Sequence, residues 1–331
     1  MLRRRLVGLV TYLITILSPA VACTVYEFTD EGFSRNVLPM LHAYPLYTAT
    51  NKAFYLYDSS WPFQCNRTGG WGDFFASGVD LLPAWTPEVA RKRGADCVRV
   101  KAGDVDELLE KIHSVSAELD IVAVNKLWKL QPWVQQQVNT ALKGFRALKG
   151  PTVAFHMRGG DLLADLSNND AVQNKERATP LSMMERAREA FDGNIKGGTC
   201  LILGDDPGLM TEAARAARKA LGCTIYRRSP SFRKAGYVQR EFIQAPLKDR
   251  CQNTVQLLVD IHLMMHADYF VGSFDSQLPR LIETLRFALL RKNKRTFADA
   301  SSRREDWYET LRKYWKEQGE AGLATPHAPA A

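Results

Sequence analysis

Short apolar runs alternate with helical stretches in two blocks of the chain, residues 24–125 and 150–290. The runs in the first block have the length and the β-branched or aromatic content of buried strands, and the stretches between them space their apolar residues at helical intervals. The predicted strands of this block are residues 24–28, 53–57 and 98–100, and its predicted helices are residues 36–49 and 106–119. This order predicts an α/β unit with a parallel sheet.

The second block repeats the alternation after a helical connector at residues 127–148, where Pro132 suits a helix start. Its predicted strands are residues 152–157, 199–203, 223–226 and 268–271, and its predicted helices are residues 181–191, 209–221, 254–266 and 278–290. Two facing Rossmann-like halves bind a ligand between them, at the carboxyl ends of their strands. We expect an N-terminal half over residues 23–148 and a C-terminal half over 149–290, followed by a C-terminal helix and a disordered tail over 291–331.

Residues 1–22 have the composition of a secretory leader. A basic start at residues 3–5 precedes the apolar stretch 6–17, and residues 20–22 (AVA) form a small-x-small cleavage site. The same segment also suits a short signal anchor, in which residues 6–22 hold the chain at a membrane. Either interpretation places the chain in the secretory pathway, and we expect it in the Golgi lumen.

Six cysteines are spread along the chain without a CxxC pair or a histidine at metal-ligand spacing, which argues against a zinc site. They are Cys23, Cys65, Cys97, Cys200, Cys223 and Cys251. An even number in an oxidising compartment suits disulfides, whose pairing is not readable from the sequence. Buried free thiols are the alternative.

Charge and motif content narrow the functional classes. The net charge of +8 falls to +5 without the three leader arginines, a mild excess that suits an anionic substrate and gives weak support for nucleic-acid binding. No GxGxxG, Walker A or GxSxG motif is present, which disfavours NAD enzymes, P-loop NTPases and α/β-hydrolases.

Polar loops follow two of the predicted strands of the second block. The first loop carries His156, Arg158 and Asp161, and an Arg fork binds phosphate bidentately. A structural Arg–Asp pair in a tight turn is the alternative. In the second loop, the carboxylates of Asp205 and Asp206 are able to bind a metal, a sugar hydroxyl or a proton, or to cap the following helix.

A third polar loop, residues 272–277 (GSFDSQ), opens a predicted helix. Free backbone N–H groups at a helix start, together with Ser and Gln side chains, make an anion site, although ordinary helix capping explains many such loops. In the preceding helix, Asp260 lies among apolar residues and needs a partner.

Taken together, these motifs resemble the GDP-fucose-dependent fucosyltransferases, above all the α1,6-fucosyltransferase branch. The matching segments, in the family's order, are TGGW at 68–71, QPW at 131–133, HMRGGD at 156–161, DDP at 205–207, VDIHL at 259–263, ADY at 267–269 and SFDSQ at 273–277. The match covers roughly residues 24–290, and several motifs in one order are far more specific than any one of them.

The resemblance implies a GT-B fold, no metal or other cofactor, and inversion from β-linked GDP-fucose to an α-fucoside on a glycan or glycoprotein. It implies that Arg158 holds the pyrophosphate with Ser276 and Gln277, and that His156 and Asp260 contact the guanine. The implied donor-binding residues are Gly32, Ser34, His156, Arg158, Asp260, Ser276 and Gln277. The implied catalytic residues are Arg158, Asp161, Asp165, Asp205 and Asp206.

Three positions depart from the α1,6 branch: Gly159, Leu162 and Leu166 stand where the family has Arg, Lys and Glu. That Glu is the family's proposed base, so neighbouring Asp165 is the candidate for its role here. The departures keep two alternatives open. One is a catalytically silent protein on the same fold that binds a nucleotide or a glycan, and the other is a glycosyltransferase that uses a different GDP-sugar.

Overall fold

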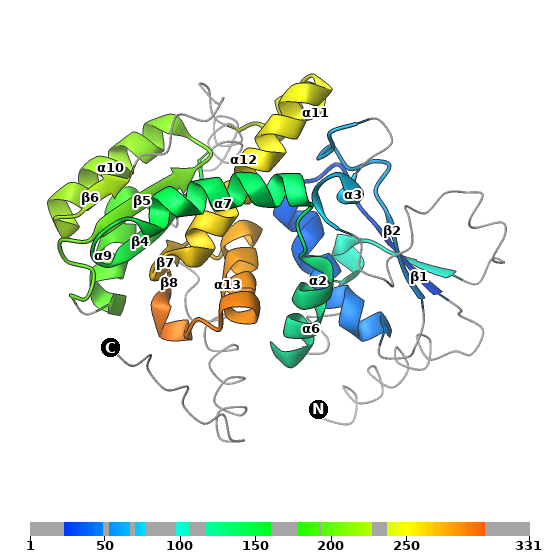
Figure 1. The fold of residues 1–331 in the computed structure, drawn as a ribbon, viewed down its shortest axis with the longest axis horizontal. Coiled ribbons are helices and arrows are strands. Elements are labelled where there is room, and N and C mark those ends of the chain that lie inside the picture. The colour runs from blue at the N-terminus through cyan, green and yellow to red at the C-terminus, as the bar shows by residue number, and fades with distance from the viewer. Residues whose placement is uncertain are drawn as a thin grey trace, which may run out of the picture.

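The computed structural model describes residues 23–48, 53–66, 70–76, 97–105, 117–159, 178–191, 193–226 and 237–301. Within these segments it contains two separate parallel sheets with helices packed on them, side by side along the long axis of the molecule (Figure 1). The expected α/β class with two Rossmann-like halves is therefore confirmed.

The first half is built on a three-stranded parallel sheet in the order β2-β1-β3. Its strands are β1 (Cys23–Glu27), β2 (Ala53–Tyr57) and β3 (Cys97–Val100), and its helices are α2 (Phe33–Thr48), the short α3 (Trp71–Phe74) and α6 (Ala117–Leu127). The central strand β1 is apolar because it is buried on both faces. Tyr26 and Phe28 belong to an aromatic core with Trp61 and Trp71, and Phe28 stacks on Trp61 at 4.7 Å between ring centroids.

The second half has a five-stranded parallel sheet in the order β6-β5-β4-β7-β8. Its strands are β4 (Thr152–Met157), β5 (Thr199–Gly204), β6 (Thr224–Tyr226), β7 (Tyr269–Gly272) and β8 (Phe297–Asp299). Counted within this half the order is 3-2-1-4-5, as in Rossmann folds, and the strand order reverses between β4 and β7. Ligands of such sheets bind at the carboxyl ends of the strands at that point.

Helices cover both faces of the second sheet, which explains its near-continuous apolar strands. One face packs against α9 (Pro180–Phe191) and α10 (Pro207–Leu221) through Val153 and Phe155 of β4. The other face packs against α7 (Pro132–Arg146) and α12 (Leu247–His266), and Ala154 lies on that side. The remaining elements are α11 (Gln239–Gln244), α13 (Gln277–Leu290) and the 3₁₀ turn η2 (Lys294–Thr296).

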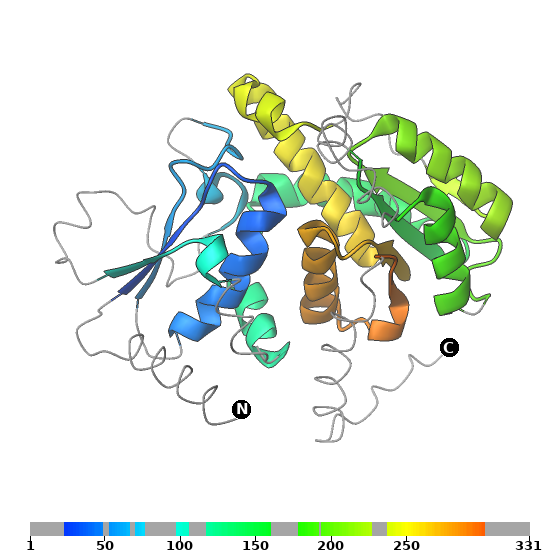
Figure 2. The same cartoon turned by 180° about the vertical axis from the view of Figure 1, so that it is seen from behind.

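The two halves share one apolar core rather than meeting across a polar seam. α13 packs against α2 and α6 of the first half as well as against α12. A single cluster of buried side chains runs from Phe33 of α2 to Leu285 of α13. α7 extends from the first half to the second, and in both views it lies with α12 between the sheets (Figures 1 and 2).

All six cysteines are disulfide-bonded, so the free-thiol alternative is wrong. Cys23–Cys97 joins β1 to β3, and Cys200–Cys223 joins β5 to the segment just before β6. Cys65–Cys251 connects the first half to α12 across 186 residues of sequence, with a Cα–Cα distance of 4.4 Å. The halves are therefore linked covalently as well as by their core.

Most predicted strands and helices are present within one or two residues, and Pro132 does begin α7. The largest differences concern α6 and α11, for which the sequence predicted no helix over most of those residues, the start of α12, and β8. α12 begins at Leu247, directly after Pro246 and well before the expected residue 254. Its first turns are polar, so the apolar spacing on which the prediction rests begins only later in the helix. β8 pairs with β7, so the second sheet extends beyond residue 290 into a segment whose strand is too short to be predicted. The helix expected at residues 106–119 and the one expected after 291 lie largely outside the described residues.

In the described segments, no helix combines the length and the hydropathy that crossing a bilayer requires. The leader at residues 1–22 lies outside those segments.

Candidate functional site

A cavity of about 450 Å³ opens between the two halves. Its walls come from the loop after β1, the ends of β4 and β5, the loop after β7 and one side of α12. This is the place that the strand order of the second sheet predicts for a ligand. All seven residues expected to bind the donor lie on its walls: Gly32, Ser34, His156, Arg158, Asp260, Ser276 and Gln277.

Arg158 follows β4 directly and forms an ion pair with Asp205 at the end of β5. The other carboxylate oxygen of Asp205 accepts a hydrogen bond from the Gly159 N–H at 2.6 Å. Asp205 is buried, whereas the Arg158 side chain keeps 29% of its surface exposed. Asp205 therefore fixes the direction of a guanidinium that a ligand in the cavity is still able to reach.

Asp205 and Asp206, expected as a pair near the reacting group, have separate surroundings. Asp205 lines the cavity, where it is bound to Arg158. Asp206 is not among the lining residues; its Oδ1 accepts from the Leu209 N–H at 2.7 Å and caps α10, with Pro207 at the first helical position. For Asp206 the capping interpretation is thus the one that the contacts support.

His156 is the second-last residue of strand β4 and is almost fully buried. Burial lowers the pKa of its imidazole to about 4; Asp205 opposes this shift and Arg158 adds to it. The ring is therefore neutral at pH 7. Its Nδ1 has no hydrogen-bond partner among the described residues, which is costly for a buried polar atom unless a ligand or water supplies one. His156 lines the cavity, and its neutral ring suits contact with a nucleobase.

The loop after β7 presents Ser276 and Gln277 at the start of α13. The Ser276 side chain makes no capping hydrogen bond to this helix. A helix start whose N-cap hydroxyl makes no capping bond to the helix suits an anionic group. The loop itself is held by Asp299 at the end of β8, which accepts from the Phe274 N–H at 3.0 Å and the Ser301 N–H at 2.9 Å.

Several lining residues were not predicted from the sequence. Asp260 shares its side of α12 with Gln256, Leu257 and Met264, which follows from i, i+3 and i+4 spacing. From the first half, Glu31 and Arg35 form an exposed ion pair on the cavity rim, at 3.4 Å. The others that line the cavity are Phe33, Phe63, Leu203, Tyr237, Gln239 and Leu278, together with Gly204 and Asp275 from two loops that the sequence had singled out. Asp299 and the buried Asn36 were missed as well, because a residue that holds a loop from behind has no motif of its own.

Asp161 and Asp165 lie outside the described residues, as do Leu162 and Leu166. The role expected of Asp165 as a base stays a prediction. Within the described segments, no three His, Cys, Asp or Glu side chains gather as metal ligands do. The expectation that no metal is needed is likewise still a prediction.

No family model and no curated protein matches the chain. Solved structures of fucosyltransferases are similar to it. The fucosyltransferase NodZ from Bradyrhizobium is 11% identical, with 80% of this chain and 91% of NodZ covered at a TM-score of 0.49. FUT1 from Arabidopsis thaliana in complex with GDP is 10% identical, with 80% of this chain and 68% of FUT1 covered at a TM-score of 0.49. POFUT1 in complex with GDP is 14% identical, with 80% of this chain and 95% of POFUT1 covered at a TM-score of 0.45. With TM-scores below 0.5, these similarities leave the reaction to be argued from the residues of this chain.

Proposed function

We propose that this chain is an inverting glycosyltransferase that transfers L-fucose from GDP-β-L-fucose to a glycan or glycoprotein acceptor. The observation that carries the proposal is the gathering of the sequence motifs around one cavity. The HMRGGD, DDP, VDIHL and SFDSQ motifs are separated by up to about a hundred residues, yet each contributes a lining residue. The loop after β1 faces them from the other half.

The residues present suit departure of a nucleoside diphosphate. When the bond from the sugar to the phosphate breaks, negative charge develops on the leaving diphosphate, and a preorganised guanidinium and helix-start N–H groups stabilise it. Arg158, oriented by Asp205, supplies the guanidinium, and the start of α13 supplies the Ser276 hydroxyl and the Gln277 N–H. No metal is part of this proposal. His156 and Asp260 contact the guanine base.

The acceptor hydroxyl must lose its proton as it attacks the sugar carbon. Asp205 is bound by Arg158 and Gly159, so it is poorly placed to act as the base. We assign the base to the segment after Gly159, where Asp161 and Asp165 are the candidates.

The three disulfides support an oxidising compartment, and with the leader they support the secretory pathway and the Golgi lumen as the location. Anchoring through residues 6–22 belongs to the same proposal.

Because Asp205 is bound by Arg158 and Gly159 and is poorly placed to act as a base, the site also supports a second candidate. This candidate is a silent protein that binds a GDP-sugar or glycan without turnover. Among the lining side chains, Glu31, Asp205, Asp260 and Asp275 bring four carboxylates against the two guanidiniums of Arg35 and Arg158. A different GDP-sugar as donor is the third candidate, because the guanine and diphosphate contacts would be shared.

The test compares Arg158→Gln with Arg215→Gln, which removes the same charge from the exposed face of α10. GDP and GDP-fucose, but not UDP or ADP, are expected to raise the thermal midpoint of the wild-type chain. A ligand at 100 times its Kd stabilises the native state by about 2.7 kcal/mol. Arg158→Gln is expected to remove this shift and to lower fucose transfer about 100-fold or more, whereas Arg215→Gln changes neither.

The outcomes separate the candidates. A GDP-specific shift with transfer from GDP-fucose supports the proposal, and the same shift with no turnover supports the silent protein. Transfer from another GDP-sugar in preference to GDP-fucose supports the third candidate. No shift with any nucleotide, or full activity in Arg158→Gln, contradicts the assignment of the cavity.

A further inference from the structure

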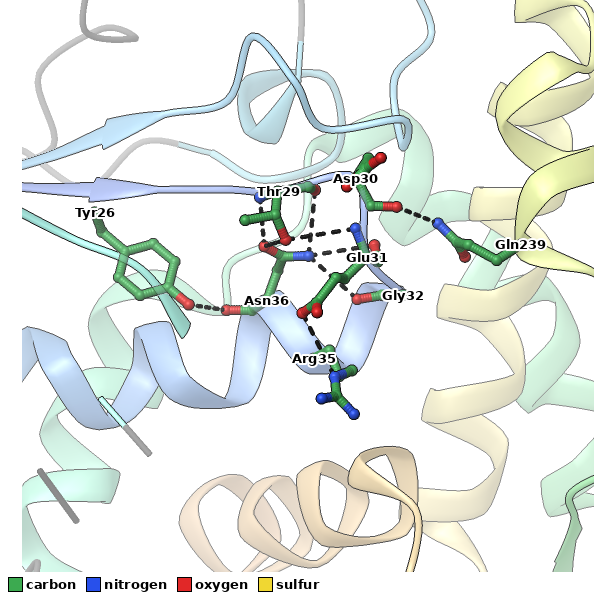
Figure 3. Close-up of polar contacts among 8 residues, drawn as sticks. All are labelled: Tyr26, Thr29, Asp30, Glu31, Gly32, Arg35, Asn36 and Gln239. Atoms are coloured by element: carbon green, nitrogen blue, oxygen red, sulfur yellow. Dashed lines mark hydrogen bonds and ion pairs between the residues drawn. The ribbon is translucent and has the colours of Figure 1, made fainter. Parts of the chain in front are cut away.

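Asn36 is a completely buried polar residue near the start of α2, between the apolar neighbours of the first-half core. A buried amide is costly unless its donors and acceptor are paired. Asn36 satisfies this condition within one short segment, residues 29–32, which forms part of the cavity wall (Figure 3).

The amide binds this segment in both directions. Its Oδ1 accepts from the Thr29 N–H at 2.8 Å, and its Nδ2 donates to the carbonyl oxygens of Glu31 at 3.2 Å and Gly32 at 3.3 Å. The Asn36 carbonyl in turn accepts from the Tyr26 hydroxyl at 2.7 Å, which ties the same helical turn to β1. A donor and an acceptor on one short side chain are needed for this pattern, and only Asn offers both at this length.

The opposite half holds the same segment from its other side. The Gln239 side chain of α11 donates through Nε2 to the Asp30 carbonyl oxygen (Figure 3). The segment is thus fixed from behind by Asn36 and bridged across the cavity mouth by Gln239, which itself lines the cavity. Gly32 ends this segment and Ser34 follows it closely in the chain, and both residues line the cavity.

From these contacts we infer that Asn36 is a positioning residue for the donor site: it sets the first-half wall of the cavity without touching the ligand. This inference rests on the proposed function for the identity of the ligand. When the wall is already held in its bound conformation, ligand binding does not have to supply the free energy of ordering it. Loss of the Asn36 amide is therefore expected to weaken binding although the amide does not touch the ligand.

The test is Asn36→Ala in the full chain, with Thr24→Val as the matched control. Thr24 is also a buried polar residue of the first half, and its Oγ1 has no hydrogen-bond partner among the described residues. Two quantities are measured on the folded proteins: the Kd for GDP by calorimetry, and the hydrogen-exchange rate of backbone amides in residues 29–36. Asn36→Ala is expected to weaken GDP binding about tenfold, the equivalent of about 1.4 kcal/mol, and to speed exchange of the Thr29 amide. Thr24→Val is expected to change neither.

Each outcome decides the inference. Unchanged GDP affinity or unchanged exchange in Asn36→Ala overturns it. If the wild-type chain binds no GDP, the proposed function fails, and the exchange rates alone then show whether Asn36 holds the wall. Should Asn36→Ala not fold, Tyr26→Phe removes the hydroxyl that β1 donates to the Asn36 carbonyl, and faster exchange of residues 29–36 supports the inference while unchanged exchange overturns it.

Discussion

The first half holds its cavity loop with a neutral amide, whereas the second half holds its two loops with carboxylates. Asn36 satisfies both N–H and carbonyl groups of residues 29–32. Asp205 and Asp299, in contrast, accept from the backbone N–H groups of Gly159 and Phe274. Both carboxylates are buried, and Asp205 also binds Arg158.

This difference follows the chemistry that each wall has to perform. A carboxylate fixes a cation and stabilises its charge, so the wall that carries Arg158 needs one. The first-half wall contributes shape, for which a neutral amide avoids the cost of a buried charge. The comparison predicts that ligand binding by the second wall, the cavity residues of the second half such as His156 and Arg158, is sensitive to charge and pH. Binding by the first wall, the cavity residues that follow β1, is sensitive to packing and hydrogen bonding. Links between the two halves keep the two walls in their relative positions.

The largest effect is expected from breaking the link between the halves. In the chain-entropy account, removing Cys65–Cys251, which closes 186 residues, costs roughly 5 kcal/mol, and removing Cys200–Cys223, which closes 23 residues, costs roughly 3 kcal/mol. The double variants Cys65→Ala/Cys251→Ala and Cys200→Ala/Cys223→Ala are compared by urea unfolding, with a difference of about 2 kcal/mol expected. The first variant is also expected to weaken GDP binding. Equal costs and unchanged binding would show that the shared core alone keeps the walls in place.

A smaller effect is expected from Asp299, the residue behind the second wall. Asp299→Ala leaves the N–H groups of Phe274 and Ser301 buried without their acceptor, at a cost of about 2 kcal/mol in the free energy of unfolding. GDP affinity is expected to fall as well, because Ser276 and Gln277 lose their support. The control Glu212→Ala, on the exposed face of α10, is expected to change stability by less than about 0.5 kcal/mol. Lost stability with unchanged GDP affinity would show that the loop after β7 does not contribute to GDP binding.

The sequence predicted most strands of the second half but missed the edge strand β8. Apolar runs such as residues 152–157 and 199–203 identify strands because both faces of that sheet are covered. β8 was missed because it has three residues and follows a polar turn. The site was predictable where the ligand-facing residue belongs to a motif, as with Arg158.

Residues that act through the backbone were not predictable. Asn36 and Asp299 are ordinary polar residues in the sequence, and their roles arise from the segments that the fold brings beside them. For Asp206 the capping alternative was readable, because Pro207 suits the first helical position, whereas the ion pair of Asp205 with Arg158 was not predicted. Disulfide pairing was unreadable for a related reason, since Cys65 and Cys251 come from different halves.

Counted per pH unit and per histidine, the smallest effect is the dependence of stability on pH, which sharpens the comparison further. Burial lowers the pKa values of both His156, on the second wall, and His262, on α12 beside Trp128, to about 4. Each ring has a lower pKa folded than unfolded, where it is about 6.5. Between pH 6.5 and 4 the unfolded state therefore binds more protons, and stability falls as the pH falls, by up to about 1.4 kcal/mol per pH unit for each ring. The neighbouring His266 shifts in the same direction by burial, whereas burial raises the pKa of the Asp58 carboxyl, an effect of opposite sign.

Comparison of variants isolates the two rings from these other groups. The free energy of unfolding is measured between pH 7 and 5 for the wild-type chain, His156→Gln and His262→Gln. Each substitution is expected to remove the part of the stability loss on acidification that its own histidine causes. In the double variant both parts are expected to disappear, because the rings lie on different elements and titrate independently. Asn36→Ala, which removes no titratable group, is expected to leave the slope unchanged. A slope that persists in both histidine variants would place the acid sensitivity in groups other than His156 and His262, such as His266, and the contrast between a charged and a neutral wall would lose its pH signature.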